Sequence, residues 1–298
     1  MMKKISVIIL GLLLVSAAAA EEVDRTLDAA PDGQVDISNI AGSITVKGWS
    51  RDQVEVTGTL GKKVEELVFE RDGDTVTIKV KVPKRSGRGI DSDLYISVPQ
   101  NSSIDVSAVS ADIDVSDVKG EQELNTVSGD VTTEAAGEDV AAESVSGDVE
   151  VRGENKDCET EANTVSGDVT LFRVAGEVNA ESVSGDVIVD EGSFNRVDLS
   201  TVNGELIFQS ALRKDGKLSA ETVNGDVDVE FVGDVSAKID VSTFNGRIRN
   251  CFGSSVPSKS ATKSALTYPP ILRRLSFPNI GQDPGNSSDT SSSRVRSS

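Results

Sequence analysis

Histidine is absent from this 298-residue sequence, and cysteine and aromatic residues are scarce. Without histidine the chain lacks the commonest general base and the commonest transition-metal ligand, so no imidazole-dependent site is available. Cys158 and Cys251 are the only cysteines, which is too few for a disulfide framework. Aromatic residues make up 4% of the chain, which argues against a surface that stacks sugar rings.

Basic residues are also few, with 30 Lys and Arg against 49 Asp and Glu. Eight of the basic and two of the acidic residues lie in residues 1–20 and 254–298, which leaves 22 basic and 47 acidic side chains for residues 21–253. A surface of this sign repels nucleic acid and anionic lipid headgroups, so we expect no nucleic-acid partner. It suits solubility, cation binding or a basic partner.

The first twenty residues have the layout of a secretory signal peptide. Lys3 and Lys4 precede an apolar stretch over residues 5–15, and Ala18-Ala19-Ala20 offers a small-residue cleavage site. The apolar stretch is shorter than the ~20 residues of a membrane-spanning helix, and no later segment approaches that length. We therefore expect cleavage, no membrane span afterwards, and a location in the periplasm, in the cell envelope or outside the cell.

A tandem repeat of about twenty residues is the main signal in the chain. The unit Thr-Val-Ser-Gly-Asp-Val, or a close variant with Asn-Gly, recurs seven times, and a degenerate copy with Ala111 precedes these. Its punctuating residues are Gly129, Gly147, Gly167, Gly185, Gly204, Gly225 and Gly246.

Each unit predicts two short strands. Apolar and polar residues alternate on both sides of the glycine, for example at Val140 and Ala142 before it and at Val149 and Val151 after it. A period of two indicates strand, and Ser-Gly or Asn-Gly indicates a tight turn. The apolar residue before each Ser or Asn, such as Val127, departs from this alternation, and we infer a bend there.

Two strands per unit cannot bury an apolar face alone, whereas stacked units can. We therefore predict an all-β fold, a β-solenoid of the single-stranded β-helix type, in which eight coils ~4.8 Å apart make a rod of roughly 38 Å. A propeller or a meander of hairpins is the alternative, but propeller blades need ~40 residues each. In the solenoid, Cys158 and Cys251 lie too far apart to form a disulfide.

The two ends differ from the repeats. Residues 21–105 predict an irregular N-terminal β cap and a first coil, with a hairpin turn at Asp72-Gly73 and a repeat-like segment at residues 39–46. Residues 106–253 hold the solenoid repeats. Residues 254–298 contain thirteen Ser, five Pro and no Glu, a composition that predicts a disordered tail.

Stacking places equivalent residues in columns. An acidic column beside the turns is a weak candidate for a calcium ladder, with the members Asp130, Asp148, Asp168, Asp186 and Asp226. One carboxylate per coil is a sparse ligand set, so solvated turn carboxylates are the preferred interpretation. A Ser/Thr column from Thr126 to Thr243 invites an ice-binding hypothesis, but β-propensity and hydroxyl hydrogen bonds explain it more simply.

The TVSGDV and TVNGDV units behind a signal peptide resemble the bacterial domain-of-unknown-function family labelled “putative adhesin”, over about residues 35–253. The resemblance implies an exported or envelope-associated β-solenoid and brings no catalytic residues. Family members usually continue past a segment like Asn250-Cys251-Phe252-Gly253 with further strands, where this chain has the Ser/Pro-rich tail.

These observations favour a non-catalytic exported envelope protein, an adhesin-like binding scaffold that presents an acidic repeat surface to a protein or a surface glycan. We expect no catalytic or cofactor-binding residues and no cofactor, weak Ca²⁺ binding aside. Two alternatives stay open: a carbohydrate-active β-helix enzyme that uses paired carboxylates, and a structural envelope spacer. A cleft lined by several Asp or Glu would favour the enzyme.

The tail provides the first test. Limited trypsin should cut at Lys259, Lys263, Arg273 or Arg274 before any of the 22 Lys and Arg of residues 21–253, since proteolysis concentrates at disordered termini. Mass spectrometry of the fragments checks this. Electrostatic attraction between the basic tail and the acidic body is screened over ~8 Å at physiological salt. A tail that resists trypsin even in high salt would show that it is packed against the body.

Overall fold

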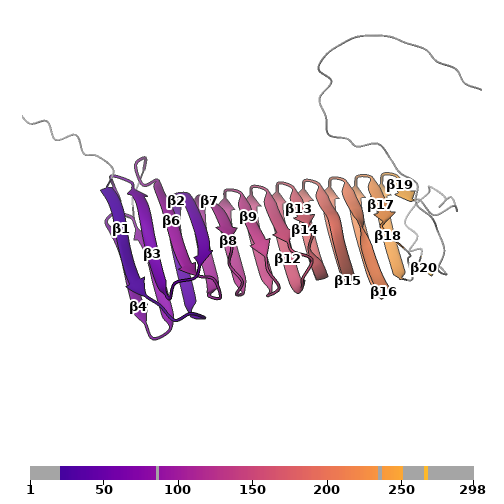
Figure 1. Ribbon diagram of the computed structural model, residues 1–298. Coiled ribbons are helices and arrows are strands. Elements are labelled where there is room, and N and C mark those ends of the chain that lie inside the picture. Colours follow the sequence, from indigo (N-terminus) through magenta and orange to yellow (C-terminus); the bar gives the residue numbers. More distant parts are fainter. Residues whose placement is uncertain (1–20, 85–86, 234–236, 251–264, 268–298) are drawn as a thin grey trace, which may run out of the picture.

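The computed structural model describes residues 21–84, 87–233, 237–250 and 265–267. Within them every regular element is a β-strand, and the chain winds into a β-solenoid whose coils lie side by side from β1 to β19 (Figure 1). The fold class predicted from the repeats is confirmed. The predicted signal peptide lies outside the described residues, and so does Cys251.

The strands form two layers, because most coils contribute one strand to each. The first sheet has the order β4 (Glu66–Asp72), β5 (Thr75–Lys81), the start of β2 (Gln34–Trp49), the start of β7 (Ser103–Ser116), β8 (Gln122–Ser128), β10 (Val140–Ser146), β12 (Asp157–Ser166), β14 (Ala175–Ser184), the end of β15 (Val187–Asn203), the end of β16 (Leu206–Asn224), β18 (Lys238–Asn245) and β20 (Ala265–Thr267).

The second sheet has the order β1 (Glu21–Asp28), β3 (Gln53–Leu60), β6 (Ser92–Pro99), the end of β2, the end of β7, β9 (Val131–Ala135), β11 (Val149–Gly153), β13 (Val169–Phe172), the start of β15, the start of β16, β17 (Val227–Phe231) and β19 (Ile248–Asn250). β2 pairs with β7 in parallel, and all pairings among the repeat strands from β7 to β19 are parallel, as stacked coils require.

The N-terminal end is built differently from the repeats. β2 already makes a full coil, with Gly42 at its turn paired to Ala111 of β7. β5 and β6 pair with it in parallel, and antiparallel pairs lie beyond them: β4 pairs with β5 through the predicted Asp72-Gly73 turn, and β3 pairs with β6 and β1. β1 is an edge strand with exposed Glu22 and Asp24, and charged side chains of this kind discourage pairing with other chains.

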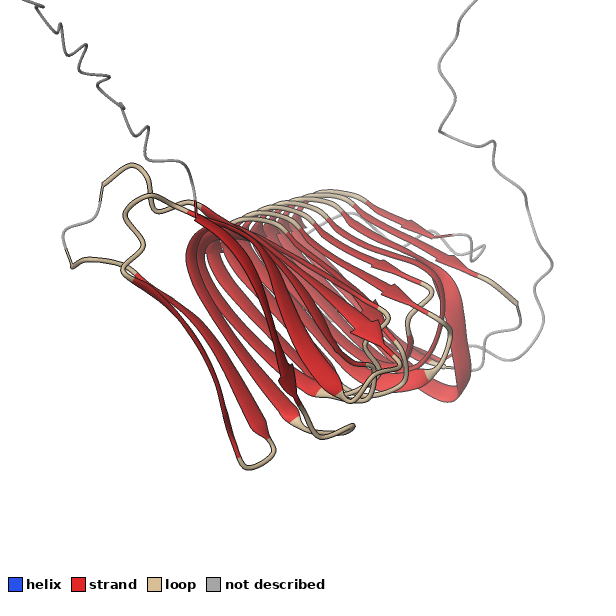
Figure 2. Ribbon diagram, turned by 60° about the vertical axis from the view of Figure 1, so that its left-hand side comes forward, coloured by secondary structure: helices blue, strands red, loops and turns tan. Residues whose placement is uncertain are grey.

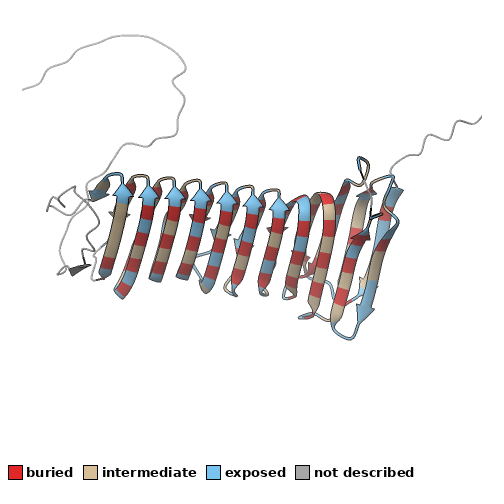
Figure 3. Cartoon of the chain, turned by 180° about the vertical axis from the view of Figure 1, so that it is seen from behind, coloured by how far each residue is buried: buried red, intermediate tan, exposed pale blue. Residues whose placement is uncertain are grey.

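The core lies between the two sheets and runs the length of the body. Inward side chains alternate with outward ones along every repeat strand, which gives the banded pattern of Figure 3. Val149 and Val151 of the second sheet and Ala142 of the first are fully buried. Near the C-terminal coils, Phe194 and Phe208 pack with ring centroids 6.0 Å apart. The valines that follow the glycines therefore face inward, as predicted.

Two sequence-based expectations need correction. The alternation continues through the valine before each Ser: Thr126 is buried and Val127 is exposed, and the parity changes one residue later, where Ser128 is also exposed. Within the expected disordered tail, residues 265–267 form β20, antiparallel to Lys238–Asp240 of β18. The rest of residues 254–298 lies outside the described part of the chain.

A matched pair of substitutions in one coil tests this packing. Val187→Asp places an unpaired carboxylate at a fully buried position and should lower the free energy of unfolding by several kcal/mol. Val183→Asp, at a position 43% exposed, should change it by less than about 1 kcal/mol. Urea denaturation measures both. Equal losses for the two variants would contradict the assignment of inward and outward faces.

Candidate functional site

The glycine turns form one edge of the body, here called the turn edge. In Figure 2 the turns of successive coils line up along this edge. The backbone N–H of Gly147 donates to the carbonyl of Ser166 in the next coil at 3.0 Å, and that of Gly185 donates to the carbonyl of Asn203 at 3.1 Å. The structure thus places the seven predicted turn glycines in a single row.

Glycine is required here by the close approach of the coils. A Cβ atom on Gly185 would lie 1.8 Å from the carbonyl oxygen of Gly167, and one on Gly167 would lie 2.1 Å from that of Gly147. The obstructing atoms belong to the backbone, so no side-chain movement relieves the contact. Any side chain at these positions forces neighbouring coils apart.

The Ser/Thr column lies inside the turn edge. Thr126, Ser144, Thr164, Ser182, Thr201 and Thr222 are each buried. Each hydroxyl donates to a carbonyl of the preceding coil, for example Thr164 to Gly147 at 2.9 Å and Thr201 to Gly185 at 2.9 Å. Ice recognition would need hydroxyls that face water, so the structure contradicts that hypothesis. The hydroxyl hydrogen bonds are made, but to backbone carbonyls rather than to one another.

The acidic column lies on the outer side of the turns. The Oδ1 atom of each aspartate accepts the backbone N–H of the equivalent residue one coil later: Asp130 from Asp148 at 2.9 Å, Asp148 from Asp168 at 2.8 Å, and Asp168 from Asp186 at 2.8 Å. The carboxylates therefore hold one turn to the next. Across the described residues, no three His, Cys, Asp or Glu side chains are grouped to hold a metal ion.

The column changes character at the C-terminal coils. Asp226 accepts from the backbone N–H of Arg247 at 2.9 Å, and its Oδ2 contacts the guanidinium groups of Arg247 and Arg249, each at 3.2 Å. The N–H bond and then the two cations lower the pKa of Asp226. Beside it, the amide of Asn245 donates to Asn224 at 3.0 Å, which begins a ladder of stacked asparagines.

An apolar stripe follows the same edge. The residue two positions before each turn glycine points outward and lies beside its equivalent in the next coil, since its neighbours pair in register. Exposure runs from 39% at Val202 to 69% at Phe244. In Figure 3 the exposed strand ends line up at this edge. The stripe, as we call it below, consists of Val109, Val127, Val145, Val165, Val183, Val202, Val223 and Phe244.

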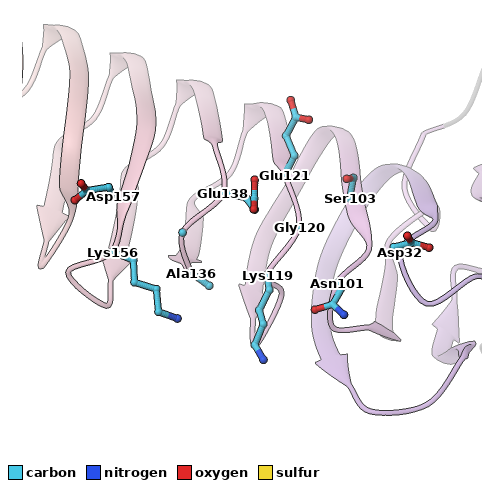
Figure 4. A pocket seen from close by; sticks show the side chains of 11 residues that line it. Asp32, Asn101, Ser103, Lys119, Gly120, Glu121, Ala136, Glu138, Lys156 and Asp157 are labelled. Carbon is cyan, nitrogen blue, oxygen red and sulfur yellow. The ribbon is translucent and has the colours of Figure 1, made fainter.

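A polar hollow of about 680 Å³ lies among corner loops between the sheets, away from the turn edge (Figure 4). It is lined by Asp32, Asn101, Ser103, Lys119, Gly120, Glu121, Ala136, Gly137, Glu138, Lys156 and Asp157. Arg213 reaches Asp157 with both terminal nitrogens, and this pairing lowers the pKa of the Asp157 carboxyl. Asp157 is therefore held as a carboxylate.

Comparison with known proteins identifies the family. A family model described as Toastrack DUF4097 matches residues 33–266, from just before β2 into β20. The chain belongs to this family. The recognition made from the TVSGDV and TVNGDV units is confirmed. No curated protein is significantly similar to this Toastrack chain.

Several solved structures resemble this chain, and the following three are among them. A “putative lipid binding protein” from Parabacteroides distasonis is 14% identical with a TM-score of 0.47, and covers 77% of this chain and 97% of its own. A “putative adhesin” from the same organism is 10% identical with a TM-score of 0.49, covering 78% and 98%. A “putative cell adhesion protein” from Clostridium sporogenes is 12% identical with a TM-score of 0.37, covering 63% and 98%.

The sequence was enough to locate the glycine, Ser/Thr and acidic columns at the turns, but not the hydrogen bonds that their side chains make between coils. The bonds from carboxylate to backbone, the asparagine ladder and the polar hollow carry no sequence signal beyond the repeat itself. The stripe did have one: an apolar residue at an outward position in every copy. In the described residues, no helix is long and apolar enough to cross a membrane.

Substitutions of Asp168 test whether the acidic column stabilises the stacked coils. Asp168→Ala removes the acceptor for the Asp186 N–H and should lower the free energy of unfolding by about 1 kcal/mol. Asp168→Asn keeps an acceptor oxygen and removes one like charge, so it should stay within about 0.5 kcal/mol of the wild type. Chemical denaturation compares them, and equal losses would show that the charge rather than the acceptor matters.

Calcium binding by the column stays a prediction with its own measurement. A ligand that binds only the folded state raises the melting temperature. We expect CaCl₂ and MgCl₂ to shift it equally, because an ion that takes six to eight oxygens finds one carboxylate per coil. A rise specific to Ca²⁺ that Asp168→Asn reduces would instead establish a calcium ladder.

Proposed function

We propose that this chain is an exported, non-catalytic binding scaffold of the cell envelope, which presents its acidic repeat surface to a protein or glycan partner. The observation that carries the proposal is that inward and outward side chains at the turn edge have different roles. Inward hydroxyls and glycine carbonyls hold the coils together, while the outward valines of the stripe recur from coil to coil and stay exposed.

The outward surface supports an electrostatic mode of recognition. Residues 21–253 carry 47 acidic and 22 basic side chains. On the first sheet, Glu143, Glu161 and Glu181 are all exposed and belong to successive coils. A charged surface of one sign attracts a basic partner from a distance and speeds its association. A rod of stacked coils holds such charges at fixed spacing.

The polar hollow is the observation that favours the carbohydrate-active alternative, since Glu121, Glu138 and Asp157 line it. A glycosidase needs one carboxyl with a raised pKa to act as the acid. Asp157 has the opposite shift, because Arg213 binds it. None of the residues that line the hollow is aromatic, so no ring is placed there to stack a sugar. We therefore favour the scaffold.

The proposal is tested with the full chain after residue 20, immobilised and exposed to envelope extract and to a glycan array. A charge-reduced variant carries Glu143→Gln, Glu161→Gln and Glu181→Gln. We expect a specific partner to be retained by the wild type and roughly threefold or more weaker retention by the variant, because steering depends on these charges.

A matched control removes the same number of charges at the N-terminal end, with Glu22→Gln, Asp24→Asn and Glu70→Gln. This control should retain the partner as the wild type does. If the wild type retains no partner from the envelope extract or the glycan array, the binding-scaffold proposal is contradicted, and the structural-spacer hypothesis remains. Release of cleaved sugars from the array would establish the enzyme.

A further inference from the structure

The stripe contains most of the large hydrophobic side chains that are exposed among the described residues. Among the described residues, ten large hydrophobic side chains are exposed. Eight of them belong to the stripe, and the other two are Tyr95 and Val232. With coils ~4.8 Å apart, eight side chains cover roughly 34 Å in a straight line. Scattered exposed valines need no explanation, but a contiguous row points to an interaction site.

The solenoid frame does not explain why the stripe is apolar. At the same turn, the glycine, the hydroxyl and the carboxylate each make a hydrogen bond between coils, whereas the valine side chain points to solvent. Threonine has the same β-propensity and would be solvated. Two residues earlier, the equally outward positions vary among Asn163, Glu181 and Ser200. The stripe position, by contrast, is apolar in every coil.

Acidic residues border the stripe on one side in nearly every coil, and on the other side in some coils only. An acidic residue follows the stripe by three positions in every coil but the last, where Arg247 stands, for example Asp148 after Val145 and Asp168 after Val165. On the other side, Glu143 and Glu181 precede it by two residues and are exposed. An apolar line with an anionic border is complementary to an apolar line with a cationic border.

The spacing of the coils selects the conformation of the occupant. An α-helix presents its apolar face once every 5.4 Å turn, close to the ~4.8 Å between coils. An extended strand presents same-side residues every ~6.6 Å and falls out of step sooner. At 1.5 Å per residue, a helix of about 22 residues covers the stripe.

We propose that the stripe is the docking site for a cationic amphipathic helix of a partner protein or peptide, laid along the turn edge with its apolar face on the valines. The proposal rests on the proposed scaffold function and specifies its partner. The valines exclude water from the apolar face of the helix, and the acidic borders pair with its Lys and Arg.

The probe is a 21-residue peptide of leucine and lysine, patterned as an amphipathic helix and labelled with a fluorophore. Fluorescence anisotropy measures its binding to the full chain after residue 20. The variant Val145→Thr, Val165→Thr, Val183→Thr keeps shape and β-propensity, and we expect at least about tenfold weaker binding, a loss of 1.4 kcal/mol or more. Tyr95→Thr with Val232→Thr, which removes exposed apolar groups elsewhere, should bind as the wild type does.

A second peptide has the same composition in scrambled order, so it keeps its charge but has no apolar face. Equal binding of the two peptides, or equal binding by the wild type and the stripe variant, overturns the proposal. If the stripe variant fails to fold, a photoreactive leucine in the peptide replaces it. Cross-links within the coils of Val127–Val202 support the site, and cross-links confined to the polar hollow overturn it.

Two other occupants have their own outcomes. If the peptide binds only after residues 268–298 are removed, the stripe is covered by the basic end of this chain and the proposal is overturned. If the wild type dimerises in sedimentation while the stripe variant is monomeric, the occupant is a second copy. If envelope partners are retained equally by the wild type and the stripe variant, the helix site is wrong but the scaffold stands.

Discussion

The close approach of successive turns is the constraint on which the rest of the structure depends. A Cβ at the turn glycines would lie between 1.7 Å, at Gly225, and 2.2 Å, at Gly129, from a backbone oxygen of the preceding coil. Because the backbones approach this closely, a short hydroxyl such as that of Ser182 reaches the glycine carbonyl below it at 3.0 Å. The same proximity lets an aspartate reach the N–H of the next turn. One steric condition therefore sets three columns of contacts.

This closeness also stacks like charges. Two carboxylates ~4.8 Å apart repel by about 1 kcal/mol in a medium with the dielectric constant of water. A hydrogen bond to a charged acceptor contributes about 1.5–3 kcal/mol, so the N–H donated to each Oδ1 offsets the repulsion. At the last repeat the sequence departs from the pattern: Arg247 replaces the acid, and it pairs with Asp226. The column thus ends on a charge that neutralises its last carboxylate.

The repeat alone was enough to predict the solenoid, the row of turns and the inward valines, because a period of two with glycine at a fixed interval leaves few ways to bury an apolar face. The N-terminal end was predictable only in outline: Asp72-Gly73 indicated a hairpin, but nothing local indicates that β3 lies antiparallel between β1 and β6. The asparagine ladder and the bond from Arg213 to Asp157 join residues 21 and 56 positions apart. Such contacts depend on the exact register and side-chain geometry between coils, which residue types alone do not encode.

Val127 shows why the turn edge was harder to interpret than the core. In the sequence its apolar character suggested a break in the alternation, because apolar side chains were assumed to face inward. The structure keeps the alternation and exposes the valine, so the departure lies in the chemistry of the position and not in the backbone before it. The coils of one repeat protein can be compared with one another. Positions that the stacking of the coils constrains, such as the turn glycines, stay constant for steric reasons, whereas outward positions such as that of Asn163, Glu181 and Ser200 vary. The stripe position stays apolar through eight coils although its side chain makes no hydrogen bond between coils. Coil stacking does not require that constancy, and binding of a partner would explain it.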